Sequence, residues 1–309
     1  MKNVLLLLFL YLFLSCNNEK EILLFSYFKG NGEDGLHLAY SEDGLKWQAL
    51  NNDKPFLAPL IGQDKLMRDP CIIVGPDKMF HMVWTISWGE KGIGYASSKD
   101  LINWSKQQYL PVMEHEAEAK NCWAPELFYD DQKEQYIICW STTIPGRFPE
   151  TDQTGDDGYN HRMYYTTTKD FKTLTKTKLF YDKGFNVIDG TIIKNKDTYL
   201  MVVKDETRWS PAKNLRVARA NEAEGPYSKP LEPFTITEEY WAEGPSIVKY
   251  NNEWIVYFDK YRKGRMGAKK TKDWKHWEDI QDISFPEGTR HGTVFKAPVN
   301  VLNKLRTKL

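Results

Sequence analysis

The sequence of 309 residues has no excess of charge of either sign, because 42 Lys and Arg residues balance 42 Asp and Glu residues. Proteins that bind nucleic acids usually gather basic residues on one surface, where they neutralise phosphates. The charge balance therefore argues against a nucleic-acid partner. The length is nevertheless sufficient for one large domain with a sizeable core.

Cysteine is scarce, since only Cys71, Cys122 and Cys139 follow the first 16 residues. Three thiols cannot all pair within one chain, and no CxxC or Cys/His spacing is present. We therefore expect no disulfide framework and no structural zinc site. Cys71 and Cys139 lie within apolar strand patterns and are expected to be small buried hydrophobic residues.

Long apolar runs are absent except at residues 4–14, which follow Lys2 and precede Ser15-Cys16. This pattern is typical of a secretory signal peptide and is short for a membrane span. We interpret residues 1–16 as a signal with a lipobox-like Cys16 as the lipidation site, and residues 17–21 as a short tether. We expect export to a bacterial cell envelope, with a lipid anchor on the periplasmic or outer face. The alternative is a soluble secreted protein.

Stretches with a helical period are also absent. Short runs rich in Ile, Val, Tyr, Phe and Trp alternate with polar turns, as in consecutive antiparallel strands. A turn motif recurs around four aspartates, Asp43, Asp100, Asp170 and Asp273. The last gap fits two repeats, with residues 223–228 as a diverged copy. Repeats of this length with about four strands each predict propeller blades.

Four expected blades begin at Asp69, Trp123, Ile188 and Glu243. The residues left over are three strands within 22–50 and one strand at 291–296, which together complete a fifth blade. Sharing a blade between the two ends closes the ring and removes exposed sheet edges. The fold class is therefore all-β: a five-bladed β-propeller with ring closure by the N- and C-terminal strands. Residues 22–309 form this single catalytic domain, expected to be a monomer, with residues 145–160 as a loop over one face.

Three carboxylates stand at the heads of expected inner strands: Asp69, Asp189 and Glu243. The repeats indicate that these three positions are equivalent. Inner-strand starts gather at one end of a propeller axis, so these side chains are expected to converge. Cleavage of a sugar acetal by water requires one carboxyl group as acid and one carboxylate as base. Repulsion from Asp189 is expected to raise the pKa of Glu243, and Arg68 is expected to keep Asp69 ionised.

Three motifs resemble those of the glycoside hydrolase family 43 superfamily: Asp69-Pro70, Trp123-Ala124-Pro125 and Glu243-Gly244-Pro245. The resemblance covers residues 22–296. It implies inverting hydrolysis with Asp69 as general base, Glu243 as general acid, and Asp189 tuning the acid's pKa and orienting substrate. It also implies exo-acting removal of a terminal α-L-arabinofuranose or β-D-xylose without a required cofactor. An exo-β-galactosidase of the same family is the alternative.

The triplet Arg68-Asp69-Pro70 also resembles a motif of the related fructan-cleaving hydrolases. Those enzymes need an earlier Asn-Asp-Pro nucleophile, and none precedes residue 68. We therefore prefer the family 43 assignment.

Further candidates for sugar binding are aromatic or polar residues on or near inner-strand ends. They are Trp84, Trp88, Trp123, Glu126, Phe185, Arg208, Trp241, Arg290 and His291, with Lys204 as an additional hydroxyl-binding candidate. Glu126 is the substitute catalytic group if Asp69 is misassigned. In relatives, a histidine placed like His291 touches a central calcium ion or a water network, so the resemblance allows Ca²⁺ near the axis. No acidic loop motif supplies the several oxygen ligands that Ca²⁺ prefers.

Two rival functions use parts of the same pattern. A non-catalytic glycan-binding surface propeller would keep the aromatic residues but would need no acid–base pair. A phosphorolytic relative would need a cluster of basic residues at the pocket. The three carboxylates favour a hydrolase, with a glycan as partner and membrane contact only through the lipid anchor.

Overall fold

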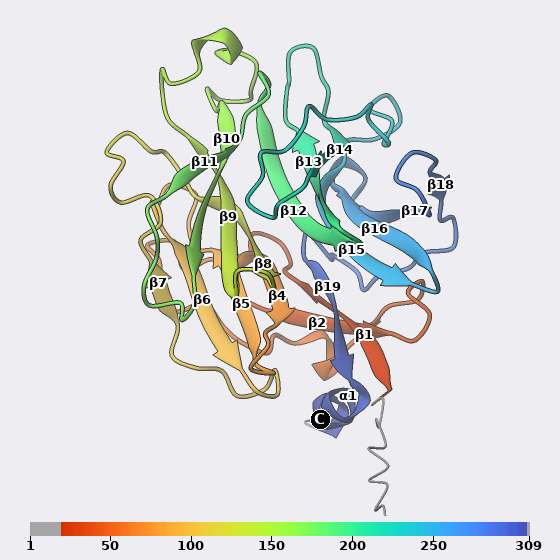
Figure 1. Ribbon diagram of the computed structural model, residues 1–309. Helices are drawn as coiled ribbons and strands as arrows, with labels where there is room; N and C mark the ends of the chain where they lie inside the picture. Colours follow the sequence, from red (N-terminus) through yellow and green to blue (C-terminus); the bar gives the residue numbers. More distant parts are fainter. Residues whose placement is uncertain (1–19, 308–309) are drawn as a thin grey trace, which may run out of the picture.

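The computed structural model describes residues 20–307 and forms five small sheets around one axis (Figure 1). Blade I contains β19 (Thr293–Pro298), β1 (Glu21–Tyr27), β2 (His37–Ser41) and β3 (Gln48–Ala49). Blade II contains β4 (Arg68–Val74), β5 (Phe80–Thr85), β6 (Ile93–Ser98) and β7 (Gln108–Leu110). Blade III contains β8 (Trp123–Asp130), β9 (Gln135–Thr143), β10 (His161–Thr168) and β11 (Lys178–Tyr181).

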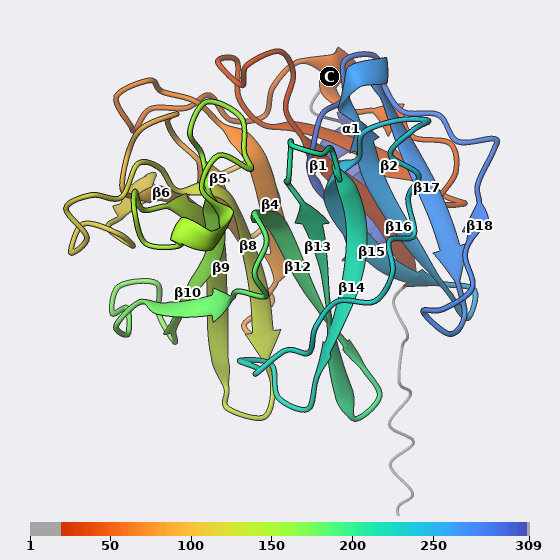
Figure 2. The ribbon, with the colours of Figure 1, turned by 90° about the horizontal axis from the view of Figure 1, so that it is seen from above.

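Blade IV contains β12 (Val187–Asn195), β13 (Thr198–Asp205) and β14 (Asn214–Ala220). Blade V contains β15 (Glu243–Tyr250), β16 (Glu253–Lys260), β17 (Arg265–Thr271) and β18 (Glu278–Asp279). Figure 2 shows blade IV between blades III and V. The all-β, five-bladed propeller is confirmed.

Ring closure occurs in blade I. Strand β1 pairs antiparallel with β19 from Glu21 opposite Pro298 to Ser26 opposite Thr293. Strand β19 also contacts β4 and β15, the inner strands of the two adjacent blades. In Figure 1 the red β1 and the blue β19 lie side by side, although they come from opposite ends of the chain. The predicted sharing of one blade by the two termini is thus confirmed.

Two expectations were wrong: that the chain has no helix, and that every blade has about four strands. A helix, α1 (Val299–Thr307), follows β19 and buries Val301, Leu302 and Leu305 against the core shared by blades I and II. This helix is too short for its apolar period to stand out in the sequence. The second difference is in blade IV, which has three strands where the repeat predicts about four, because no strand forms in residues 229–242 after the diverged turn at 223–228.

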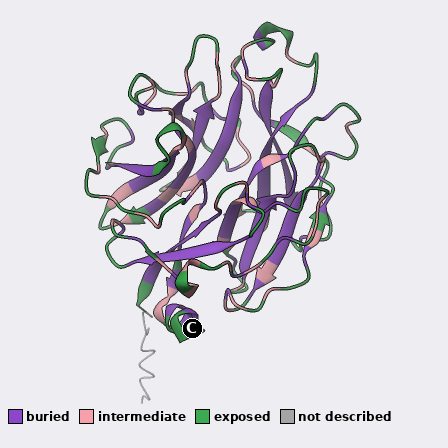
Figure 3. Cartoon of the chain, turned by 180° about the vertical axis from the view of Figure 1, so that it is seen from behind, coloured by how far each residue is buried: buried purple, intermediate pink, exposed green. Residues whose placement is uncertain are grey.

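Aromatic side chains fill the spaces between blades. Between blades I and V, Phe25 and Trp47 pack with their ring centroids 5.4 Å apart, and Tyr257 and Phe285 complete the cluster. Most strand residues are buried, and most exposed residues lie in loops (Figure 3). Cys71 and Cys139 are buried free thiols, as expected, and Cys122 is buried and free as well. Within residues 20–307, no helix has the length and apolar character needed to cross a membrane.

The repeated turn motif has a structural role. In blade II, the Asp100 carboxylate accepts hydrogen bonds from the backbone N–H groups of Ile102 and Asn103, at 2.9 and 2.7 Å. The Ser98 hydroxyl accepts a third from the N–H of Leu101, which has a left-handed backbone (φ 63°). Asp43, Asp170 and Asp273 make the same pair of backbone contacts. Side-chain capping therefore stabilises the same tight turn in four blades.

Replacing Asp100 with Ala is expected to lower the free energy of unfolding at pH 7 by about 1 kcal/mol, the usual cost of removing a side-chain cap. Partial burial raises the pKa of Asp100, but the hydrogen bonds from Asn103 and Ile102 outweigh it and lower the pKa below its ordinary value. A lowered folded pKa stabilises the protein above the unfolded pKa, and this contribution is lost as the pH falls through the folded value. The difference between the two proteins in urea unfolding should therefore shrink below about pH 4.

The matched control is Asp197→Ala, which removes an exposed aspartate from the turn between β12 and β13. An equal loss of stability in both variants would contradict the capping role of Asp100.

Candidate active site

A β-bulge lies at the head of four inner strands. The register shifts after Arg68, Trp123, Ile188 and Glu243, in β4, β8, β12 and β15. Each bulge includes one left-handed residue, with φ between 47° and 57°: Asp69, Ala124, Asp189 and Gly244. Bulges redirect side chains and are common beside active sites. Here they lie at the heads of the strands that contribute the candidate catalytic carboxylates.

The three carboxylates are not at equivalent positions, which corrects the sequence-based expectation. Asp69 and Asp189 occupy the left-handed position of their bulges, whereas Glu243 is one residue earlier and Gly244 takes that position. A Cβ atom on Gly244 would lie 2.2 Å from the His291 ring. Glycine is therefore required here by both its backbone conformation and the close approach of His291.

The carboxylates converge on one pocket of about 250 Å³. The predicted residues that line it are Asp69, Trp88, Trp123, Asp189, Lys204, Glu243, Arg290 and His291. Sequence reasoning missed Thr85, Glu206 and Tyr261, which also line it. These three follow or end the second strand of a blade, and only knowledge of the strand pairing places them opposite the inner-strand heads.

Five predicted sugar-binding residues do not line the pocket, and three of them pack among other side chains of the propeller. Trp84 has 0% exposure and packs in the core of blades I and II, so stacking on a sugar is wrong for this side chain. Phe185 packs against the core of blades III and IV. Glu126 is buried and accepts hydrogen bonds from the Thr191 hydroxyl (3.1 Å) and the Cys71 thiol (3.5 Å). Burial raises the pKa of Glu126 to about 7.

Trp241 and Arg208 lie beside the pocket and do not line it. The Trp241 ring is 6.0 Å from that of Tyr261, a lining residue, and the Arg208 guanidinium is 5.0 Å from the Trp241 ring. Their roles in sugar binding stay predictions.

Asp69 is held in its ionised form. Burial alone would raise its pKa, but a hydrogen bond and the charge of His291, the charge of Arg68 and a hydrogen bond from Thr85 together lower it to about 2. The Thr85 hydroxyl donates to Asp69 Oδ2 at 2.9 Å, and His291 Nδ1 lies 3.3 Å from Oδ1. Asp69 in turn helps raise the pKa of His291 to about 9 against the opposing effect of burial. A carboxylate ionised at neutral pH can accept a proton from water, as a general base does.

Glu243 lies between two cations. Lys204 Nζ is 3.1 Å from its Oε2, and Arg290 Nη2 is 3.2 Å from its Oε1. Burial favours the neutral acid, but these two charges outweigh burial and lower the pKa of Glu243. The expectation that Asp189 raises the pKa of Glu243 above its usual range is therefore wrong for the unliganded site. Burial, with repulsion from Glu243, instead raises the pKa of Asp189 itself, to about 6.

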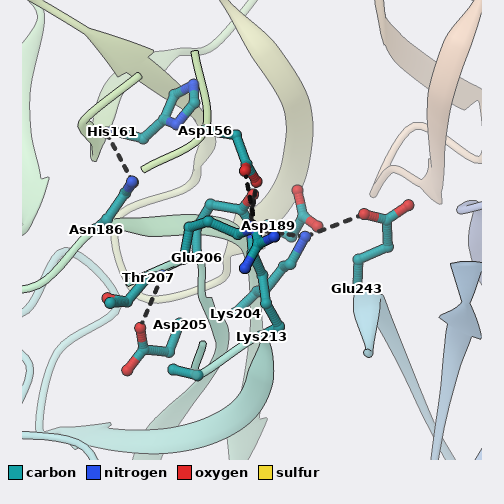
Figure 4. A network of polar contacts seen from close by, with 12 residues as sticks. Asp156, His161, Asn186, Asp189, Lys204, Asp205, Glu206, Thr207, Lys213 and Glu243 are labelled. Carbon is teal, nitrogen blue, oxygen red and sulfur yellow. Dashed lines mark hydrogen bonds and ion pairs between the residues drawn. The ribbon is translucent and has the colours of Figure 1, made fainter. Parts of the chain in front are cut away.

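Lys204 has a second anionic partner on the side away from Glu243. Its Nζ lies 2.5 Å from Glu206 Oε2, and Lys213 Nζ lies 2.5 Å from Glu206 Oε1. Figure 4 shows this chain of charges running from Asp156 through Lys213, Glu206 and Lys204 to Glu243. Lys204 can therefore leave Glu243 without losing every carboxylate partner.

Calcium near the axis, which the family resemblance allows, stays a prediction. Among the described residues, no group of three or more His, Cys, Asp or Glu side chains is arranged to hold a metal ion. His291, the residue named for that role, faces Asp69 as a charged imidazolium with a pKa of about 9.

Comparison with known proteins agrees with this geometry. A family model described as a probable glycosyl hydrolase domain, related to family 43, matches residues 19–300. A curated α-L-arabinofuranosidase from Bifidobacterium longum subsp. longum is 26% identical over 126 residues, which are 38% of this chain and 12% of that protein. The chain therefore aligns with only a small part of this longer relative.

Solved structures share the fold at low sequence identity. A thermostable family-43 glycoside hydrolase superposes with a TM-score of 0.56 and 14% identity, over 73% of this chain and 78% of the other. An exo-β-1,3-galactanase from Phanerochaete chrysosporium superposes with a TM-score of 0.52 and 15% identity, over 69% of this chain and 49% of the other. At these identities the likeness is evidence for the propeller fold alone.

Replacing Lys204 with Met is expected to raise the pKa of Glu243, because the substitution removes the larger of the two cationic contributions that favour its ionised form. Arg290 and His291 still favour the ionised form, while Asp189, Asp259 and Tyr261 also face this carboxylate. The measurement is a pH titration of the side-chain carboxyl ¹³C resonances, with Glu243 assigned by comparison with Glu243→Gln.

Lys269→Met is the matched control, because Lys269 is also buried and ion-paired (2.9 Å to Asp279) but lies outside the pocket. An unchanged Glu243 titration in Lys204→Met, or an equal shift in the control, would refute the assigned cause.

Proposed function

Because the chain belongs to the glycosyl hydrolase family whose model it matches over residues 19–300, we propose that it is an exo-acting, inverting glycosidase that removes one terminal sugar from a glycan. The observation that carries the proposal is that Asp69, Asp189 and Glu243 line one pocket. Asp69 and Glu243 have different cationic partners there, His291 for Asp69 and Lys204 for Glu243.

In the proposed reaction, Asp69 accepts a proton from a water molecule as the water oxygen bonds to the anomeric carbon. Glu243 donates its proton to the glycosidic oxygen as the bond from that oxygen to the anomeric carbon breaks. The products are the free sugar with inverted configuration and the shortened glycan. Asp189 accepts the backbone N–H of Gly244 at 3.0 Å and so positions the strand head that carries Glu243. The reaction consumes only water.

Glu243 needs a proton before it can act as the acid. We propose that a bound glycosidic oxygen takes the place of Lys204 at Glu243 Oε2 and that Lys204 then pairs with Glu206 alone. Loss of one neighbouring cation raises the pKa of Glu243 when the substrate is present. With Lys204 and Arg290 lowering that pKa in the free enzyme, the alkaline limb of kcat/KM lies at low pH. Activity is therefore expected to favour acidic conditions.

The size of the pocket supports exo action. About 250 Å³ is somewhat less than the 300–1,000 Å³ of typical ligand pockets, so it suits one sugar ring better than a longer oligosaccharide. Trp88 and Trp123 form an aromatic wall, with ring centroids 5.3 Å apart and Trp123 Nε1 donating to the Trp88 carbonyl at 3.0 Å. Aromatic faces of this kind pack against the C–H groups of a sugar.

The proposed sugar is α-L-arabinofuranose or β-D-xylose, with β-galactose as the alternative. A partial match to a protein named as an α-L-arabinofuranosidase supports the first, and a shared fold with an exo-β-1,3-galactanase supports the alternative. Phosphorolysis is less favoured, because Lys204, Arg290 and His291 already contact carboxylates in the pocket. Phosphate would have to compete with these carboxylates for the same cations.

The reaction is tested with 4-nitrophenyl α-L-arabinofuranoside, β-D-xyloside and β-D-galactoside, using the chain without residues 1–16. Asp69→Asn should lower kcat/KM by about 10²–10⁴-fold on the active glycoside, the usual contribution of a general base. Glu243→Gln should lose more activity on the corresponding natural disaccharide than on the aryl glycoside, because 4-nitrophenolate departs with little need for a proton. ¹H NMR of the first product reports whether the configuration is inverted.

Glu232→Gln, an exposed substitution outside the pocket, is the control. Turnover that survives in Asp69→Asn would refute the assigned base. Glycan binding with no turnover in the wild-type protein would instead establish the glycan-binding propeller.

We also propose that the protein is exported and anchored through a lipid on Cys16, which lies outside the described residues along with the rest of the signal and most of the tether. The basis is the sequence pattern of residues 1–16. In bacteria fed a radiolabelled fatty acid, the wild-type protein should incorporate label and sediment with membranes, and Cys16→Ser should do neither. Equal labelling of both proteins would refute the anchor.

A further inference from the structure

A surface of two tryptophans and two arginines, each exposed or half-buried, lies beside the pocket. It consists of Arg208, Trp209, Trp241 and Arg262, and we call it the rim shelf. The Arg262 guanidinium is 3.7 Å from the Trp241 ring, and that of Arg208 is 4.0 Å from Trp209 and 5.0 Å from Trp241. Trp209 is 60% exposed. Because the Trp241 ring is 6.0 Å from the pocket residue Tyr261, the shelf is continuous with the pocket.

The two arginines differ in their partners. Arg208 Nε lies 3.1 Å from Asp156 Oδ1. Arg262 has no carboxylate within ion-pair distance among residues 20–307, and its recorded contact is the face of Trp241. Exposed Glu238 and Glu239 lie in the segment before Trp241, but neither forms an ion pair with the shelf. The shelf therefore has one paired and one unpaired guanidinium.

The carboxylates behind the shelf are already shared. Asp156 also accepts Lys213 at 2.8 Å, and Glu206 is shared by Lys213 and Lys204. Three carboxylates, Asp156, Glu206 and Glu243, thus pair with the three cations Arg208, Lys213 and Lys204. None of these carboxylates forms an ion pair with Arg262, so the groups behind the shelf leave its charge unpaired.

The shelf lies on the side of the acid. Trp241 is two residues before Glu243, which begins β15. A general acid protonates the departing oxygen, so the sugar attached to that oxygen leaves past Glu243. A residue beside Glu243 and outside the pocket therefore faces the leaving-group sugar and not the terminal sugar.

We propose that the rim shelf binds an anionic sugar, carrying a carboxylate or a sulfate ester, in the leaving-group position. Guanidinium groups bind such oxyanions through paired, charge-assisted hydrogen bonds, and the indole faces pack against the sugar ring. A neutral sugar would need the indoles but would leave Arg262 unpaired. The leaving-group role depends on the proposed glycosidase function, whereas binding of the anionic sugar does not.

The test measures binding without turnover. Galacturonate, galactose 6-sulfate and galactose are titrated at low ionic strength, and dissociation constants are obtained by ligand-observed NMR. Either anionic sugar, or both, should bind more tightly than galactose, and the stronger one identifies the preferred oxyanion. Arg262→Gln should weaken that binding by roughly tenfold or more, the usual effect of losing hydrogen bonds to a charged group, with a much smaller effect on galactose.

Arg306→Gln is the matched control, because Arg306 also stacks on an aromatic ring (4.3 Å from Tyr40) but lies in α1 away from the pocket. Equal affinity for all three sugars, no saturable binding of either anionic sugar, or an unchanged affinity in Arg262→Gln would overturn the proposal. If the anionic sugars bind more tightly than galactose but the protein has no glycosidase turnover, the proposed function is refuted and the anionic-sugar site is supported. Turnover without tighter binding of the anionic sugars would support the proposed function and refute the anionic-sugar site on the shelf.

Discussion

Antiparallel pairing of β1 with β19 is the constraint on which the rest of the structure depends. It closes the ring of blades, and it also fixes the segment just before β19, which contributes Arg290 and His291 to the pocket. His291 contacts Asp69 from blade II, and Arg290 contacts Glu243 and Asp259 from blade V. The segment before the terminal strand β19 thus supplies counter-charges for both the candidate base and the candidate acid.

In the site that results, carboxylates and cations balance one another and are largely shielded from solvent. Asp69, Asp189 and Glu243 alternate with His291, Lys204 and Arg290 in a pocket where most of the charged atoms are shielded from solvent. Burying several carboxylates together would by itself raise all their pKa values. The arrangement of the cations divides them, because Asp69 is brought to a pKa of about 2 and Asp189 to about 6. Placement of cations, more than spacing of carboxylates, differentiates the groups.

The architecture could be predicted from sequence because its signals are local and repeated. Alternating strand patterns and the recurring aspartate turns mark the blades, and the unpaired strands at the two ends leave ring closure as the simplest arrangement. The convergence of Asp69, Asp189 and Glu243 follows from that topology. The features that sequence reasoning missed depend on packing against residues that are distant in the sequence. Helix α1 is short and is stabilised by packing, and Glu126 looks like a strand-head residue until the fold covers it.

The electrostatic environment of Glu243 was beyond sequence reasoning for a similar reason. Lys204 is 39 positions before Glu243 and Arg290 is 47 positions after it. Residues this far apart in the sequence belong to no common local motif that would predict their contact. Only the pairing of strands across different blades places both cations at one carboxylate. The one-residue offset of Glu243 also needed the strand register, because the Gly244-Pro245 pair does not reveal which residue adopts the left-handed conformation.

Ring closure also determines when the site is complete during biosynthesis. Ribosomes make β1 first and β19 last, so β1 has no inner-strand partner until nearly the whole chain has been produced. Contacts between such distant parts of a chain form slowly, because a long loop must close before they can be made. A nascent or partly translocated chain contains the carboxylates but lacks the arginine and histidine that set their charges. Assembly of the complete pocket is thus delayed until the last strand has docked.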